Sequence, residues 1–322
     1  MLTSAVREVA HEITVDAPAT RVYDLVADVE KWPEIFLPTV HVEYLEKTGN
    51  SERIRIWATA NGTAKVWTSR REHDRAGLAI AFRQEQSAHP VGRMGGTWVV
   101  EPVGPDRSRV RLRHDYAAAT GDPADLEWID RAVDHNSTVE LAALKSYAEL
   151  AGSDGPDELL TFDDTVDVAG SAEDVYDFLN AAQRWEERLP HVVRVSLVED
   201  EPGLQVLEMD TRTKDGSVHT TRSVRVCQAP RLIVYKQVVL PALMTLHTGR
   251  WSIGETGAGH LAVTSRHTVR INRARIAEVL GAGADLASAR EFVRGALSGN
   301  SLATLRHAKA YAEGVDARRG TP

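Results

Sequence analysis

The pattern of hydrophobic and polar positions divides the first half of the chain into strands and helices. Alternating positions predict a strand over residues 8–15. Pro18 is suited to open a helix, and apolar residues at helical spacing predict that this helix runs over residues 19–29. Trp32-Pro33 should end it, because the residue before a proline avoids the helical conformation. Residues 34–37 are compatible with a second short helix.

The remainder of the first half is predicted to be a run of strands followed by one long helix. Turn-forming pairs such as Asn61-Gly62 separate the strands, which are predicted over residues 40–47, 52–60, 63–72, 78–86, 96–102 and 109–117. A helix with an intermittent apolar stripe is predicted over residues 123–150. This order predicts an α+β fold. A curved antiparallel sheet should wrap around the long C-terminal helix and enclose an interior cavity where side chains leave space.

The second half repeats the first at an offset of 153 residues, so that Val22-Tyr23-Asp24 returns as Val175-Tyr176-Asp177. Near the end the offset grows to 164, and Asn136-Ser137 returns as Asn300-Ser301. We therefore predict two copies of one domain, over residues 1–151 and 159–322, joined by a linker over residues 152–158. The second copy is predicted to have strands over residues 162–168 and within 192–270, and a long helix over residues 284–314.

Composition excludes several classes of protein. The net charge of −8 argues against a general nucleic-acid binder. Cys227 is the only cysteine, so no disulfide framework exists and a small buried side chain is expected. No apolar run approaches the ~20 residues of a membrane span, and residues 1–15 lack the apolar core of a signal peptide. We expect a cytoplasmic protein without membrane or nucleic-acid partners. No metal-binding or phosphate-binding motif is present, so no cofactor is predicted.

The strand over residues 65–71 has charged and aromatic residues on one face. Lys65, Trp67, Ser69 and Arg71 share this face. Either the face meets solvent, or it lines a polar cavity in which Trp67 forms a flat wall and Arg71 a fixed cation. At the constant offset, Arg222 shares the corresponding face of the second copy, one pair earlier along the strand, and His219 lies on the opposite face. This shift predicts two cavities of similar kind and different shape.

Other candidates have a structural and a functional interpretation. Trp32 and Trp185 either close the sheet edge or line a pocket. His114 and His267 recur at equal positions, as buried hydrogen-bonded residues or as proton-transfer groups. An inward amide at Asn136 either binds a ligand carbonyl or the backbone. The remaining candidates for substrate contact are Phe36, Thr39, Phe82, Met94, Trp98, Tyr235 and Trp251. Of these, Phe36, Phe82, Met94 and Trp98 are more typical of a core than of a ligand-binding wall.

Two segments carry a resemblance to a known family. Residues 29–36 (VEKWPEIF) and 67–71 (WTSRR) resemble the polyketide aromatase/cyclases of bacterial type II polyketide synthases, which have the helix-grip fold of START and Bet v 1-like proteins. The tandem copies make the chain similar to the di-domain members. The resemblance implies that Arg71, Trp67 and Trp32 line a pocket. Thr39 stands where some relatives have a tyrosine, and the second copy keeps Trp185 but replaces the following proline with Glu186.

The resemblance also implies a substrate and a reaction. The substrate would be a poly-β-ketone held as a thioester on an acyl carrier protein, and other synthase subunits would be transient partners. The reaction would be C7–C12 aldol closure of the first ring, dehydration, or both, without a metal or redox cofactor. Arg71 and its counterpart Arg222 would stabilise developing negative charge, and His114, a water or the substrate enol would move the proton. The alternative is a non-catalytic tandem protein that binds a hydrophobic ligand. The more complete motif favours the first copy as the main chemical site.

Overall fold

The computed structural model describes residues 6–150, 159–212, 216–257 and 259–319. The chain separates into two compact units, each with its own sheet. The predicted linker over residues 152–158 lies outside the described residues, and so do residues 1–5 and 320–322 at the ends of the two predicted domains. No described helix combines the length and the apolar character that crossing a bilayer requires.

The first unit consists of one antiparallel sheet, three short helical segments and one long helix. Its strands are β1 (Arg7–Val15), β2 (Thr39–Thr48), β3 (Ser51–Ala60), β4 (Thr63–Asp74), β5 (Ala79–Gln86), β6 (Val91–Gly104) and β7 (Arg107–Ala118). Its helical segments are α1 (Ala19–Ala27), η1 (Val29–Lys31), α2 (Trp32–Ile35) and α3 (Pro123–Leu150). The long helix has the bounds that its apolar stripe predicts.

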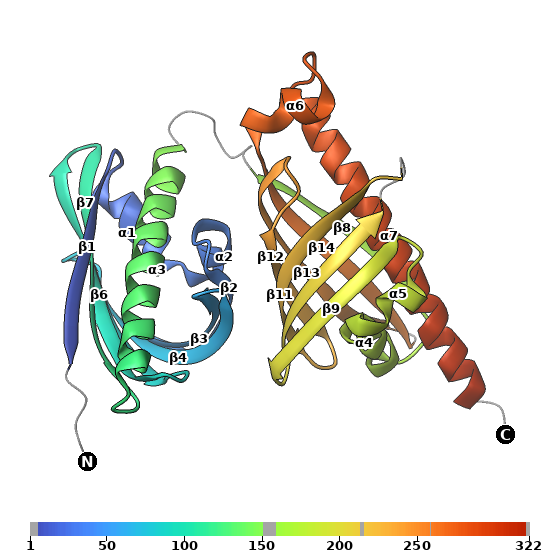
Figure 1. Cartoon of the computed structure of the whole chain (residues 1–322), viewed down its shortest axis with the longest axis horizontal. Coiled ribbons are helices and arrows are strands. Elements are labelled where there is room, and N and C mark those ends of the chain that lie inside the picture. Colours follow the sequence, from blue (N-terminus) through green and yellow to red (C-terminus); the bar gives the residue numbers. More distant parts are fainter. Residues whose placement is uncertain (1–5, 151–158, 213–215, 258, 320–322) are drawn as a thin grey trace. The chain divides into compact units, whose positions relative to one another are not determined.

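The seven strands lie in the order β1-β7-β6-β5-β4-β3-β2, so the chain returns to place β1 at the edge beside β7. The sheet curves, and α3 lies across its concave side (Figure 1). Apolar side chains of α1 and α3, including Val22, Val26, Leu141 and Leu144, pack against the sheet in one buried cluster. Burial of this apolar area is the main favourable term that holds the helices on the sheet.

The connection between α1 and β2 differs from the sequence expectation. Helix α1 ends at Ala27, and a short 3-10 turn, η1, leads into α2, which begins at Trp32 with Pro33 in its first turn. Pro33 therefore begins a helix and does not end one. A proline is tolerated there because the first backbone N–H groups of a helix have no partner within it.

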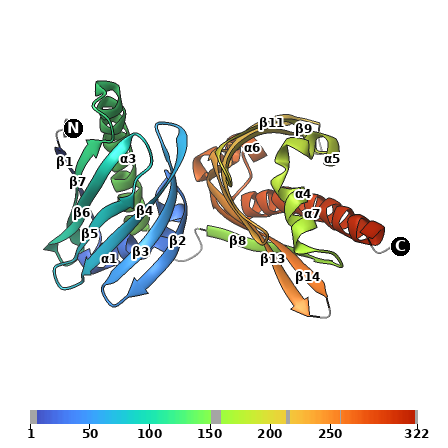
Figure 2. The same ribbon diagram turned by 90° about the horizontal axis from the view of Figure 1, so that it is seen from below.

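The second unit repeats this order. Its strands are β8 (Leu159–Val168), β9 (Val192–Glu201), β10 (Leu204–Arg212), β11 (Val218–Gln228), β12 (Leu232–Val239), β13 (Met244–Gly257) and β14 (His260–Ile271). Its helical segments are α4 (Ala172–Asn180), η3 (Ala182–Arg184), α5 (Trp185–Arg188), η4 (Arg273–Arg275), α6 (Ile276–Leu280) and α7 (Leu286–Arg319). The strand order is β8-β14-β13-β12-β11-β10-β9, and the sheet curls around α7 (Figure 2).

Each unit thus has a curved antiparallel sheet that grips a long C-terminal helix, as the sequence predicts. The second unit differs in the residues between its last strand and its long helix, where η4 and α6 are added. These added residues account for the growth of the repeat offset from 153 to 164.

Candidate active site in the first unit

A cavity lies between the inner face of the first sheet and α3. It contains about 1130 Å³ of space, counted with its open mouth. The structure places all eleven candidates of the first unit in its wall: Trp32, Phe36, Thr39, Trp67, Ser69, Arg71, Phe82, Met94, Trp98, His114 and Asn136. The mixed face of β4 therefore lines a cavity, and of the two interpretations open from the sequence the interior one is correct.

Arg71 belongs to this wall and is almost completely buried, with 1% of its surface exposed. Its Nη1 donates to the Glu52 carboxylate at 2.6 Å, and its Nη2 donates to the carbonyl of Val26 at 2.7 Å. Nη1 also donates to the carbonyl of Ala27 at 3.3 Å. Both carbonyls belong to the last turn of α1, where a cation is favourable because the carbonyl groups there have no helical partner.

The guanidinium of Arg71 also stacks on the Trp32 ring, 4.9 Å from its centroid, and Trp32 Nε1 donates to the Val26 carbonyl at 3.1 Å. Arg71 therefore joins β4, the end of α1 and the tryptophan that begins α2. This arrangement fixes one wall of the cavity. Several N–H donors of Arg71 already have protein partners. Its main effect is therefore to hold the elements of the cavity wall together, and not to present a free cation to a ligand.

The pairing of Glu52 with Arg71 follows from the turn between β3 and β4. Asn61 and Gly62 both have positive φ, 49° and 74°, as a two-residue hairpin turn requires. The turn fixes the register, and this register places Glu52 opposite Arg71. The Asn61-Gly62 signal in the sequence was sufficient to find this pair, although Glu52 was not among the predicted site residues.

The buried ion pair perturbs both of its members. Burial alone would raise the pKa of Glu52, but the interactions with His73 and Arg71 hold it below its ordinary value. Burial lowers the pKa of Arg71, and the Glu52 charge opposes that change. His73 Nε2 lies 3.2 Å from the Glu52 carboxylate. Glu52 is therefore ionised at neutral pH.

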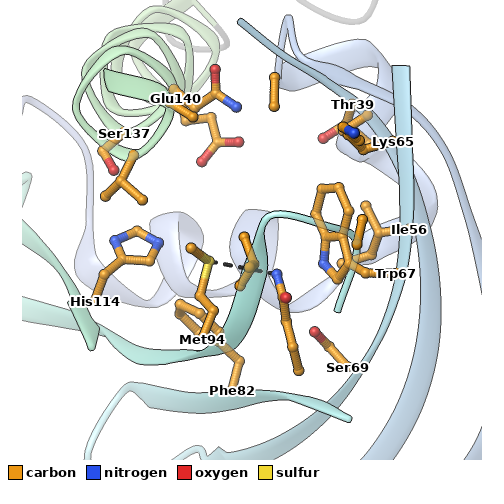
Figure 3. A pocket seen from close by; sticks show the side chains of 18 of the residues that line it. Thr39, Ile56, Lys65, Trp67, Ser69, Phe82, Met94, His114, Ser137 and Glu140 are labelled. Carbon is orange, nitrogen blue, oxygen red and sulfur yellow. Dashed lines mark hydrogen bonds between the residues drawn. The ribbon is translucent and has the colours of Figure 1, made fainter. Parts of the chain in front are cut away.

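His114 on β7 projects into the middle of the cavity (Figure 3). Its ring meets the edge of Phe82 at 5.4 Å, and its buried Nδ1 has no hydrogen-bond partner among the described residues. Burial lowers the pKa of His114 to about 4, with a smaller effect from the charge of nearby His11. The imidazole is consequently neutral at physiological pH, with one nitrogen that accepts a proton and one that donates.

The space for the Phe82 ring depends on a glycine on the neighbouring strand. Gly96 on β6 pairs with Phe82 on one side and with His114 on the other. A Cβ at position 96 would lie 1.9 Å from the Arg113 carbonyl oxygen and 2.7 Å from the Phe82 ring. Gly96 therefore allows the sheet to carry an aromatic ring and a histidine side by side at the cavity floor.

Two polar residues of the wall, Ser137 and Glu140, were not predicted from the sequence. Both point into the cavity from α3, and Lys65, which the sequence places on the same face as Trp67, lies on the opposite wall near Thr39 (Figure 3). Ser137 adjoins Asn136, whose Nδ2 donates to the Thr59 carbonyl at 3.1 Å and so joins α3 to β3. The recurrence of Asn136-Ser137 in the second copy is the signal in the sequence from which this serine could have been found.

The comparison with known proteins agrees with this geometry. The family model described as polyketide cyclase/dehydrase and lipid transport matches residues 6–149 and again residues 160–313. The chain belongs to this polyketide cyclase family. The double match assigns one family domain to each unit of the structure.

Two curated relatives match this chain over nearly their whole length. The chain is 52% identical over 297 residues to the granaticin polyketide synthase bifunctional cyclase/dehydratase of Streptomyces virginiae, covering 92% of this chain and 97% of that protein. It is 47% identical over 315 residues to the actinorhodin polyketide synthase bifunctional cyclase/dehydratase of Streptomyces coelicolor, covering 94% and 96%.

Solved structures lead to the same family. The crystal structure of the di-domain aromatase/cyclase BexL from the BE-7585A biosynthetic pathway is 59% identical, with a TM-score of 0.84 over 95% of this chain and 99% of that chain. StfQ, from the steffimycin pathway, is 36% identical, with a TM-score of 0.82 over 97% and 100%. These findings confirm the predicted tandem helix-grip fold and the predicted polyketide aromatase/cyclase class.

Within this polyketide cyclase, the predicted second arginine is wrong. Arg222 is exposed and lies opposite Glu208 on the neighbouring strand β10. The residue equivalent to Arg71 is Arg225, which is 2% exposed, donates to the Leu179 carbonyl at 2.6 Å and stacks on Trp185 at 5.2 Å. The hairpin before β11 has one residue more than its counterpart and the connection after it has one fewer, so a constant offset assigns every residue of β11 to the wrong face.

The other candidates of the second unit lie in its interior. Trp185 and Trp251 are buried in one hydrophobic cluster. His219 is half-buried on the inner face of β11, and burial lowers its pKa. Tyr235 and His267 contact each other, with 3.1 Å between the tyrosine oxygen and His267 Nδ1. In this polyketide cyclase, Trp98 and Trp251, and likewise His114 and His267, keep the equivalent positions that the sequence repeat predicts.

Proposed function

We propose that this polyketide cyclase folds a carrier-bound poly-β-ketone in the cavity of its first unit, closes the first ring between C7 and C12, and promotes loss of water to give an aromatic ring. The observation that carries the proposal is His114, a neutral imidazole in the wall of the cavity beside Trp67, Phe82 and Met94, whose buried Nδ1 has no partner among the described residues. Relatives named as bifunctional cyclase/dehydratases support the same reaction class.

The chemistry requires a base that is not already protonated. In ring closure, a C–H bond between two carbonyl groups breaks, its proton passes to His114, and the resulting enolate carbon attacks a second carbonyl carbon. The new alkoxide then takes this proton back from the protonated His114, so no other reagent is consumed. Proton transfer of this kind contributes about 10²–10⁴-fold to the rate, and holding the reacting carbons together contributes more.

Arg71 has a positioning role in this proposal, and its charge contributes to the field in the cavity. The contacts that support this role are those with Glu52, the Val26 carbonyl and the Trp32 ring. By holding Trp32, Arg71 sets the width of the cavity where the folded chain must turn. The shape of that turn determines which carbons meet, so Arg71 acts on regiochemistry through the wall.

The partners follow from the substrate. A poly-β-ketone attached as a thioester reaches the open cavity while it stays on an acyl carrier protein, and the other synthase subunits supply the chain. Relatives that belong to polyketide synthases support this setting, in which the protein acts in the cytoplasm.

The test is reconstitution with a minimal synthase and its carrier protein. His114→Gln preserves the size and hydrogen bonding of the side chain but accepts no proton. We expect it to slow first-ring closure by about 10²-fold or more. Arg71→Lys should keep activity and give a mixture of ring patterns. If the product profile is the same with and without the protein, the chain is a binding protein and the proposed reaction is wrong.

A further inference from the structure

The interior of the second unit contains a buried polar cluster where the first unit has its cavity. His247 on β13, His267 on β14 and Ser301 on α7 are 2%, 3% and 3% exposed. Ser301 Oγ lies 2.6 Å from His267 Nε2, and His267 Nδ1 lies 3.0 Å from His247 Nε2. His247 Nδ1 lies 2.9 Å from Gln237 Oε1. We call these four residues the histidine relay.

The proton positions in the histidine relay follow from its ends. Gln237 Oε1 only accepts, so His247 Nδ1 must donate to it and the neutral ring presents a lone pair at Nε2. His267 then donates from Nδ1 to His247 and accepts at Nε2 from the Ser301 hydroxyl. The Tyr235 oxygen, 3.1 Å from His267 Nδ1, is a second acceptor for that N–H. Burial holds the pKa of His267 at about 4 and that of His247 well below its ordinary value, so both rings are neutral.

This order of groups is that of an activated hydroxyl. A hydroxyl hydrogen-bonded to a neutral imidazole, whose other nitrogen is held by a third group, is the arrangement in which a side-chain oxygen both takes and gives a proton. Ser265 Oγ, at 3.2 Å from His267 Nε2, is a further polar neighbour of the ring. The Phe162 ring stacks on His267 at 5.1 Å and fixes its plane.

Comparison of the two units shows that the histidine relay is not simply part of the fold that both units share. His267 and Ser301 match His114 and Ser137, which line the cavity of the first unit. His247, however, stands where the first unit has Met94. An apolar filling at this place is thus compatible with the fold, and the buried polar chain is an addition specific to the second unit.

The added segment of the second unit lies over this interior. Residues 272–285, which we call the cap, include η4 and α6 (Figure 1). Ile276 and Leu280 pack with Leu243 and Val293, and the Asn272 N–H donates to the Leu243 carbonyl at 2.8 Å. In the first unit, the residue equivalent to Val293 is Ile129, and it lines the open cavity.

The cap ends in a segment suited to bending. Gly281 has a φ of 97°, and neither Gly281 nor Gly283 has any atom within 4 Å of the position a Cβ would take. Glycine at these two positions tolerates a change of backbone direction, which is the property that a hinge requires. Movement of the cap would expose the interior at the end that is open in the first unit.

We propose that the second unit holds a second proton-transfer site, in which Ser301, supported by His267 and His247, removes water from a cyclised β-hydroxy ketone admitted beneath the cap. The proposal rests on the proposed function and assigns the dehydration step to the second unit. The C–H bond beside the ketone breaks, its proton goes to Ser301 Oγ, and the Ser301 proton goes to His267 Nε2. The C–OH bond then breaks, the departing hydroxide recovers that proton as water, and a C=C bond forms.

The experiment follows water loss in the full chain, reconstituted with a minimal synthase and carrier protein. Mass spectrometry separates the aromatic product from the cyclised intermediate, which is heavier by one water. We expect Ser301→Ala to slow water loss by about 10²-fold while ring closure continues. Ser301→Thr, which keeps the hydroxyl, should restore most of the rate. His260→Gln, an exposed histidine on the same strand paired with Asp167, is the matched control and should behave as the wild type.

An unchanged rate of water loss in a folded Ser301→Ala protein overturns this proposal but leaves the proposed function intact, because ring closure is reported by His114→Gln. An unchanged rate of ring closure in His114→Gln overturns the proposed role of His114 in ring closure, but it does not test the role of Ser301 in water loss. If Ser301→Ala does not fold, the wild-type chain decides. The imidazole nitrogen resonances of His267 should shift when a cyclic β-hydroxy ketone is added, and the absence of any shift would show that the relay does not meet ligand.

Discussion

Arg71 and Arg225 occupy the same place in the two units although 154 residues separate them. Arg71 lies between Glu52 and Phe82 on the adjacent strands, and Arg225 lies between Gln205 and Tyr235. Each guanidinium stacks on the tryptophan that begins the second short helix and donates to a carbonyl at the end of the helix before it. These contacts of the arginine are common to both units. The residue opposite it on the neighbouring strand is charged in the first unit, Glu52, and neutral in the second, Gln205.

Removal of the Arg71 side chain should destabilise the protein strongly. Arg71→Ala leaves the Glu52 carboxylate buried without its partner, and breaking a buried pair in this way costs about 3–5 kcal/mol. Urea unfolding of the full chain measures the loss. Arg70→Ala is the matched control, because Arg70 is its exposed neighbour and pairs with Glu85 at the surface. Such surface pairs contribute about 1 kcal/mol or less. Equal unfolding midpoints for the two variants would contradict the structural role of Arg71.

Glu52 should make the stability of the protein depend on pH in the acid range. Its folded-state pKa lies below the ordinary value of 4.5. The stabilisation is therefore fully present above that value and is lost as pH falls through the lower folded-state pKa. Glu52→Gln introduces the amide that the second unit has at Gln205. We expect it to lose stability at neutral pH, by about 1–3 kcal/mol for a charged hydrogen bond.

The measurement is urea unfolding of wild type and Glu52→Gln at a series of pH values. The difference between the two curves should shrink as the acid range is entered, because a protonated Glu52 resembles glutamine. Glu85→Gln is the control, since Glu85 also has a lowered pKa but lies near the surface in contact with Arg53. A difference between wild type and Glu52→Gln that stays constant with pH would rule out this linkage.

The sequence predicts the elements of each unit well because each one depends on local pattern. The long helix over residues 123–150 has the predicted bounds, and the strands agree with prediction to within a few residues, apart from the earlier start of β6 at Val91. The cavity-lining residues of the first unit were predictable for a similar reason. In a strand, one inward residue implies that the residues two positions away also point inward, so Trp67, Ser69 and Arg71 enter the cavity together.

The wrong choice of arginine in the second unit arose because two changes in chain length around β11 cancel each other. The repeat has one offset on both sides of β11, and this constancy hid an added residue before the strand and a missing one after it. A shift of one residue exchanges the two faces of a strand, so Arg222 took the place of Arg225. The histidine relay was beyond the sequence for another reason. His247 and Gln237 reach His267 from neighbouring strands, and only the pairing of β12, β13 and β14 brings these side chains together.

Gly96 should be intolerant of any side chain. Gly96→Ala places a methyl group against the Arg113 carbonyl and the Phe82 ring, so backbone must move. Overpacking of this kind costs about 1–3 kcal/mol, and it should also narrow the cavity beside His114. Thermal unfolding measures the first effect, and the affinity for a planar aromatic ligand measures the second. Gly121→Ala is the matched control, because nothing lies within 4 Å of its Cβ. Parallel losses in both variants would mean that the close contact is unimportant.

The dependence of ring closure on pH should report the protonation of His114. Burial lowers its pKa to about 4, and the neutral imidazole is the base. The rate should therefore be insensitive to His114 through the neutral range and fall only as pH approaches that value from above. An unperturbed histidine would give the same fall near pH 6.5, so the two cases are well separated. The measurement is the single-turnover rate of ring closure across this range.

His11→Gln provides a directed shift of the same profile. His11 lies on β1 beside β7 and is paired with Asp134, and its charge lowers the pKa of His114. Without that charge the His114 pKa should rise, so the acid limb of the profile should move to higher pH while the neutral-range rate stays the same. The direction is fixed, because a like charge disfavours protonation and its removal favours it. If His11→Gln moves the acid limb to lower pH, the proton transfer belongs to another group. The same conclusion follows if His11→Gln shifts the limb equally in a protein that already carries His114→Gln.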